Sequence, residues 1–197
     1  MQLFLKSGEV AWGGIMMSVS VILIILASVI ESSSLFFLAA ASFICGIVQR
    51  KFSVKVSVLF AFGTFIIGLI LAPDKLYCFT FMGFSVYVIV AEYFREKLND
   101  SYKKGDEKLI KRNTKISFLV KFIVYHFLLA LALLFVKIFT GIDISSAAPW
   151  IKSLAKVPVI LVVVCIIAAE ALWIIFDRAY VFFQNICAST LDVYLKR

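Results

Sequence analysis

Residues 157–176 read VPVILVVVCIIAAEALWIIF, an apolar run in which Glu170 is the only charged residue. A helix needs about 20 predominantly apolar residues to cross the ~30 Å hydrocarbon core of a bilayer, and this run has that length. It therefore predicts a transmembrane helix. Because a carboxylate at membrane depth is costly, we expect Glu170 to face a partner, a cavity or a ligand.

Five similar runs precede this one, and hydrophobic residues make up 63% of the 197-residue chain. The runs are continuous, whereas a transmembrane β-barrel would show short segments of alternating polarity. We predict an all-α, polytopic membrane protein, a six-helix transmembrane bundle that forms a single domain over residues 1–197. The first run is longer than the apolar region of a signal peptide, so we expect it to be retained as a span. The predicted spans are 10–30, 34–49, 54–72, 76–94, 117–140 and 157–178.

The basic residues predict the orientation of the bundle. With the N-terminus inside, 16 of the 20 Lys and Arg fall on the inner side of the membrane. An excess of Lys and Arg marks cytoplasmic loops, so both termini are predicted to be cytoplasmic, in a plasma membrane. The segment 95–115 is then a basic cytoplasmic loop, either a solvated linker or a short surface helix. It accounts for much of the net charge of +8. We interpret this positive charge as a contact with the lipid bilayer and not with nucleic acid.

One pair of intramembrane polar residues is a candidate for chemistry. His126 lies in the fifth predicted span at a depth similar to that of Glu170 in the sixth. Because these spans run antiparallel, the two side chains can meet. Such a pair would either relay protons or hold a cation, or it would fix the packing of two helices through a hydrogen bond.

Other charged residues near the inner ends of the fourth and sixth spans are interpreted as boundary charges. They are Glu92, Arg95, Glu96, Asp177 and Arg178. Long charged side chains at such positions extend towards water or pair with one another.

The sequence predicts neither a metal site nor a cofactor. The chain has one histidine, and its four cysteines form no C-x-x-C pair, whereas zinc takes three or four ligands. It also lacks G-x-S-x-G, H-E-x-x-H and the phosphate-binding loop of ATPases. No motif therefore argues for an enzyme, although an intramembrane enzyme stays open as an alternative.

The outer loops contain polar residues that could line a pocket open to the outside. As a candidate ligand-binding set we single out Glu31, Asp74, Lys75, Tyr77 and Lys137. Taken one at a time, each is better explained as an interfacial residue, and only the set as a whole suggests a pocket. Their mixed charges do not identify a ligand.

The first span also carries a stripe of small residues. Gly14 and Ser18 are four residues apart and so share one face of a helix, which lets another helix approach closely. The stretch 10–20, VAWGGIMMSVS, resembles the first span of the substrate-binding S components of energy-coupling-factor transporters. The stretch 71–76, LAPDKL, is similar to uncharacterised S-component-like proteins of Firmicutes, which tend to have Pro-Asn-Lys at that turn.

The resemblance implies a function for the chain. S components are small six-span proteins with cytoplasmic termini, and their first span docks on a membrane coupling subunit that works with ATPases. By that resemblance, Gly14 and Ser18 are the docking positions. The leading hypothesis is thus a substrate-capture subunit for uptake of a small molecule. The alternatives are a non-transporting assembly protein of a larger membrane complex, and a self-contained proton-coupled carrier or intramembrane enzyme that uses His126 and Glu170.

Overall fold

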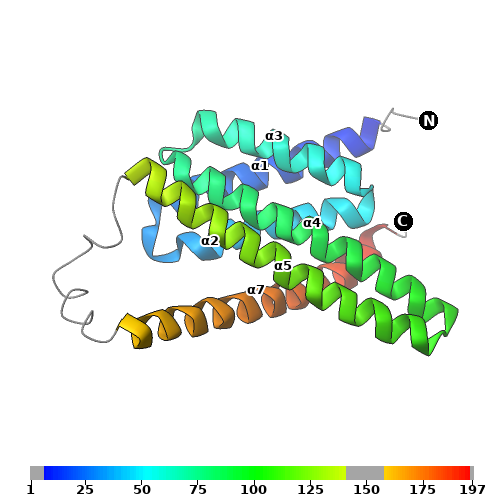
Figure 1. Ribbon diagram of the computed structural model, residues 1–197. Helices are drawn as coiled ribbons and strands as arrows, with labels where there is room; N and C mark the ends of the chain where they lie inside the picture. Colours follow the sequence, from blue (N-terminus) through cyan, green and yellow to red (C-terminus); the bar gives the residue numbers. More distant parts are fainter. Residues whose placement is uncertain (1–6, 141–157, 196–197) are drawn as a thin grey trace.

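The computed structural model describes residues 7–140 and 158–195, which contain helices and no strand (Figure 1). Five helices in this part of the chain are long and apolar enough to cross a membrane. The chain is thus a helical, multi-pass membrane protein, as its hydropathy pattern predicts. The elements are α1 (Ser7–Val29), the short 3-10 helix η1 (Glu31–Ser33), α2 (Ser34–Lys51), α3 (Val54–Leu71), α4 (Lys75–Lys104), α5 (Glu107–Thr140) and α7 (Pro158–Leu195).

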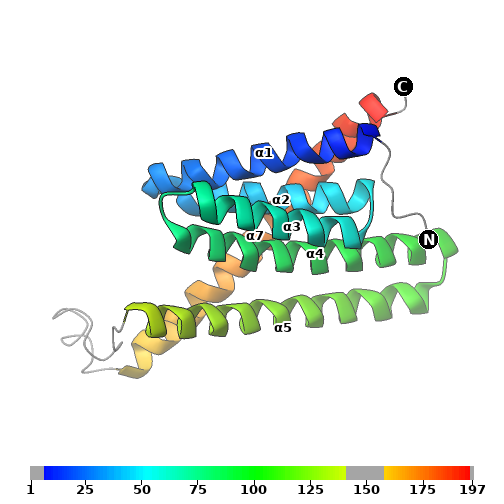
Figure 2. The ribbon, with the colours of Figure 1, turned by 90° about the horizontal axis from the view of Figure 1, so that it is seen from above.

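Successive helices run in opposite directions along one long axis (Figure 1). The start of α1 and the end of α7 lie at the same end of the molecule as the α2–α3 and α4–α5 connections. We call this the basic end, because Arg50, Lys51, Lys103 and Lys104 occupy the last turns of α2 and α4 there. Seen from above, α5 runs alongside α4, and α7 crosses the other helices obliquely (Figure 2).

Helix α2 is the centre of the bundle. Ten of its residues are buried, namely Leu38 and the unbroken run from Ala41 to Gln49, and it packs against α1, α3, α4 and α7. By contrast, α1, α3 and α5 expose large apolar side chains such as Ile22, Ile70 and Phe127. Exposed apolar side chains are expected where lipid, and not water, surrounds a helix.

Helices α4 and α5 each begin after a short connection, and a side chain caps each start. The side chain of Asp74 accepts a hydrogen bond from the amide of Leu76 at the start of α4 (2.9 Å). Asp106 accepts from the amides of Lys108 and Leu109 at the start of α5. Both satisfy amides that a helix N-terminus leaves without a partner.

The segment 95–115 differs from the predicted loop. It is a helical hairpin, because α4 continues to Lys104 and α5 begins at Glu107. Gly105 makes the turn with φ +67°, a conformation that glycine adopts without strain. The amide of Asn113 donates to the Ser101 hydroxyl (2.7 Å) and ties the two arms together. The loop was predicted from the end of the apolar run, but a helix need not end where the bilayer does.

Candidate functional site

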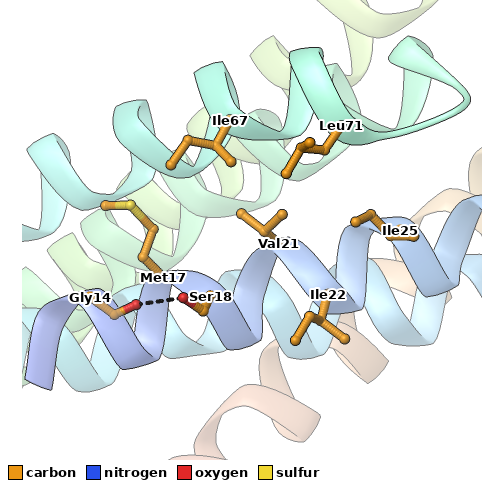
Figure 3. A pocket seen from close by; sticks show the side chains of 8 residues that line it. All are labelled: Gly14, Met17, Ser18, Val21, Ile22, Ile25, Ile67 and Leu71. Carbon is orange, nitrogen blue, oxygen red and sulfur yellow. Dashed lines mark hydrogen bonds between the residues drawn. The ribbon is translucent and has the colours of Figure 1, made fainter.

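The face of α1 that carries Gly14 and Ser18 is uncovered. Both residues are exposed, and a Cβ atom built on Gly14 would meet nothing within 4 Å. The Ser18 hydroxyl donates to the Gly14 carbonyl on the same helix (3.0 Å, Figure 3), so its polar group is satisfied without a partner. In the described part of the chain, this face is therefore open to close approach by another helix.

An apolar groove of about 270 Å³ runs beside these residues, between α1 and α3. Figure 3 shows Met17 and Val21 of α1 on the side that faces α3, where Ile67 and Leu71 complete the wall. Among the described lining residues, Ser18 supplies the only side-chain hydroxyl. The groove suits apolar side chains of a neighbouring membrane helix, since it offers no charged group to hold a polar ligand.

The structure brings His126 and Glu170 together across α5 and α7. The His126 Nε2 and Glu170 Oε1 atoms are 2.9 Å apart, and both side chains are half-buried. The adjacent Tyr125 hydroxyl donates to the Ala169 carbonyl (2.8 Å). The pair thus forms part of a polar contact between two helices, at the position that the antiparallel spans predict.

The geometry determines how many protons this pair holds. His126 Nδ1 lies 2.9 Å from the Phe122 carbonyl, which can only accept, so Nδ1 carries a hydrogen. The Nε2–Oε1 contact then contains one proton, carried either by an imidazolium facing a carboxylate or by a carboxylic acid facing a neutral ring. In both forms the pair has no net charge, which lowers its cost inside a membrane.

Glu92 is the centre of a buried polar cluster that joins α2, α4 and α7. Its side chain has no exposed surface, and it accepts from Arg50 (3.1 Å), from Arg95 (2.8 Å) and from the Tyr180 hydroxyl. Arg50 also donates to the Gln184 carbonyl of α7 (3.2 Å). The sequence-based interpretation of Glu92 as a boundary charge did not predict that it is buried. The sequence did indicate its pairing with Arg95, because a spacing of three residues places an acid and a base on one helix face.

Close contact between α2 and α7 depends on Gly46. A Cβ atom at this position would lie 2.6 Å from the Gln184 side-chain nitrogen and closer still to the Tyr180 hydroxyl. The Gln184 nitrogen donates to the Phe43 carbonyl (3.0 Å). The Phe43 ring packs against Phe176, Tyr180 and Phe183 of α7, with ring centroids 5.3–5.4 Å apart. A side chain added at position 46 would therefore displace the Tyr180 or Gln184 side chain where α7 crosses α2.

A second polar cluster surrounds Asp177 of α7. Asp177 accepts from the Tyr87 hydroxyl (2.8 Å) and from Lys121 (2.9 Å), and the Trp173 ring nitrogen donates to the Tyr87 oxygen (2.9 Å). These contacts connect α4, α5 and α7. Asp177 is thus paired, which agrees with its interpretation as a boundary charge. Its partners lie on two other helices, α4 and α5.

Four of the five residues predicted to bind a ligand at the outer loops have described side chains, and these have structural positions within the bundle. Asp74 caps α4, Lys75 donates to the Ala72 carbonyl at the end of α3 (2.7 Å), and Glu31 lies exposed in η1. Tyr77 packs on the apolar core. The side chain of Lys137 lies outside the described residues. Among the described residues, Glu31, Asp74, Lys75 and Tyr77 line neither the cavity between α1 and α3 nor the one between α4, α5 and α7.

Metal ligands do not gather in the described residues, where no group of three or more His, Cys, Asp or Glu side chains is placed to hold an ion. Comparisons with protein-family models, curated proteins and solved structures found no match. A functional argument for this chain therefore rests on its own residues.

Proposed function

We propose that this protein is a substrate-capture membrane subunit of an uptake transporter, energised by separate ATPase subunits. The observation that carries the proposal is the uncovered small-residue face of α1 beside an apolar groove. Gly14 and Ser18 are exposed there, and the groove between α1 and α3 has room for side chains of a second helix. A membrane coupling subunit docked on this face would bury it.

The proposal gives the bundle six spans, with α7 as the sixth. It orients the basic end towards the cytoplasm of a bacterial cell, in agreement with the distribution of Lys and Arg. The small-molecule ligand would bind at the opposite end of the bundle, near Asp74, Lys75, Tyr77 and Lys137, with Glu31 in the adjoining connection. Transport would follow from movement of the whole bundle against the coupling subunit.

Co-purification from native membranes in mild detergent tests the proposal directly. Two ATPase subunits and one large membrane subunit should be recovered with the wild-type protein. Gly14→Leu should abolish their recovery, because the added side chain projects into the contact with the partner. Gly83→Leu is the matched control, since a Cβ at Gly83 of α4 also meets nothing within 4 Å. Recovery of the same subunits with Gly14→Leu would refute docking through α1.

A second candidate is a non-transporting assembly protein, and the α4–α5 hairpin favours it. The hairpin extends beyond the predicted spans and exposes the basic residues Lys103, Lys104, Lys108, Lys111 and Arg112. Such an arm suits contacts with other proteins of a membrane complex. Co-purification with membrane proteins unrelated to any ATPase, lost on deletion of the hairpin and kept in Gly14→Leu, would support this function instead.

A further inference from the structure

A cavity of about 590 Å³ opens between α4, α5 and α7. Its volume lies within the range of roughly 300–1,000 Å³ that is typical of small-molecule sites. One part of its lining is apolar, with Leu98, Phe118, Ile174 and Val181. The other part carries charges and hydroxyl groups, with Thr114, Ser117, Lys121, Asp177 and Arg178. The cavity is therefore amphipathic.

Among the described residues, the charges that line this cavity leave one cation, Arg178, without a partner. Asp177 is neutralised by Lys121 at 2.9 Å and also accepts from Tyr87, which lies outside the lining. Arg178 is exposed and makes no ion pair or hydrogen bond with the described residues. The Ser117 hydroxyl likewise donates to none of them, so a guanidinium and a hydroxyl are both available to an anion. Arginine presents several donors in a planar fork that matches phosphate oxygens.

The level of the cavity in the bundle points to the source of that anion. The predicted spans end near residue 94 in α4, residue 117 in α5 and residue 178 in α7, and the lining residues fall on both sides of these ends. Lipid phosphates lie at the level where the apolar part of a span ends. Phe118 and Ile174 are more than half exposed and continue the apolar wall towards the hydrocarbon side.

We propose that this cavity binds the phosphate-bearing headgroup of an anionic phospholipid, with Arg178 as the main phosphate contact, Ser117 as a hydroxyl donor, and Phe118 and Ile174 against the upper acyl chains. Basic pockets between transmembrane helices are a known means of holding anionic headgroups. The site is separate from the α1 face and does not depend on the proposed docking of α1.

Native mass spectrometry of the purified full chain tests the proposal. The protein is incubated in detergent with phosphatidylglycerol or phosphatidylcholine, and the retained lipid is counted. Arg178→Gln should reduce retention of phosphatidylglycerol about five-fold or more, down to the level of phosphatidylcholine. Arg112→Gln removes the same charge from the exposed hairpin outside the cavity and should change retention less than about two-fold if the site is specific. Equal loss in both variants would overturn the proposal in favour of diffuse attraction to the basic end.

The source of the phosphate is decided by competition with glycerol 3-phosphate, which carries a phosphate and no acyl chains. The proposal expects it to leave the phosphatidylglycerol in place, because the apolar wall contributes to binding. Complete displacement would overturn the lipid assignment and identify a site for a soluble organic phosphate. Equal retention of the two lipids by the wild-type protein would overturn the site itself.

Fluorescence of Trp173, which lines the cavity, reports whether the lipid occupies this place. In a Trp12→Phe, Trp150→Phe background it is the remaining tryptophan, because the chain has three. Brominated phosphatidylglycerol should quench its emission more strongly than brominated phosphatidylcholine, and Arg178→Gln should abolish the difference. Identical quenching by both lipids in the unmodified cavity would contradict the proposal.

Discussion

Replacing Glu92 by Gln should destabilise the bundle strongly. The substitution keeps the shape of the side chain but leaves Arg50 and Arg95 without a counter-charge and puts an amide group against three donors. Removing one partner of a buried ion pair typically costs about 3–5 kcal/mol. Each arginine side chain is 25% exposed, so water compensates part of the loss, and we expect about 3 kcal/mol, the lower end of that range.

Buried cysteines provide the assay for this loss. Cys45 and Cys78 have no exposed surface, so a thiol-reactive dye labels them only when the bundle opens on heating. A Cys165→Ser, Cys187→Ser background removes the other two thiols. A loss of about 3 kcal/mol corresponds to a fall in Tm of roughly 6–12 °C for a chain of this size.

A neighbouring carboxylate supplies the control. Glu96 lies one helical turn further along α4 and makes no ion pair or hydrogen bond with the described residues, so Glu96→Gln should shift Tm by less than about 3 °C. Tyr180→Phe in the Glu92→Gln background should cost less than it does alone, because the hydroxyl has already lost its carboxylate acceptor. A Tm for Glu92→Gln within about 2 °C of the parent protein would refute the assignment of Glu92 as the centre of the cluster.

Three further outcomes are expected. Gly46→Ala should cost about 1–3 kcal/mol in the same thermal assay, because the added methyl overlaps the Tyr180 hydroxyl; an unchanged Tm would contradict the close approach of α7. Glu170→Gln should cost only about 0.6 kcal/mol and leave function intact if its contact with histidine serves packing; loss of uptake with normal stability would instead favour the proton-coupled alternative. In intact cells, a membrane-impermeant maleimide should label Lys75→Cys and not Lys108→Cys, and the reverse pattern would invert the orientation.

The helical, multi-pass architecture follows from the sequence because the bilayer leaves few choices. A backbone in hydrocarbon must satisfy its own hydrogen bonds, so each long apolar run forms a helix. The start of α2 at Ser34 and of α3 at Val54 agree with the runs to the residue. The end of α4 and the start of α5 differ from the predicted span boundaries. Outside the membrane, the length of a helix depends on capping residues such as Gly105 and Asp106 and not on hydropathy.

The contacts between helices were predictable only in part. The contact between His126 and Glu170 follows from their similar depths in two antiparallel, neighbouring spans. The shared face of Gly14 and Ser18 follows from their spacing of four residues along a helix. The burial of Glu92 could not be derived in this way. It depends on the rotation of α4 about its axis and on the oblique crossing of α7, which brings Tyr180 to Glu92 across 88 residues of sequence.

The sequence by itself determined that this chain crosses membranes as helices, roughly where those helices lie, and which of its ends is basic, because these properties depend on local composition. Only the tertiary structure decided which polar residues are buried together and where cavities remain. Those features depend on the angles at which helices cross, and helix length and hydropathy do not determine crossing angles. The Glu92 cluster and the cavity beside Arg178 both arise where α7 crosses its neighbours.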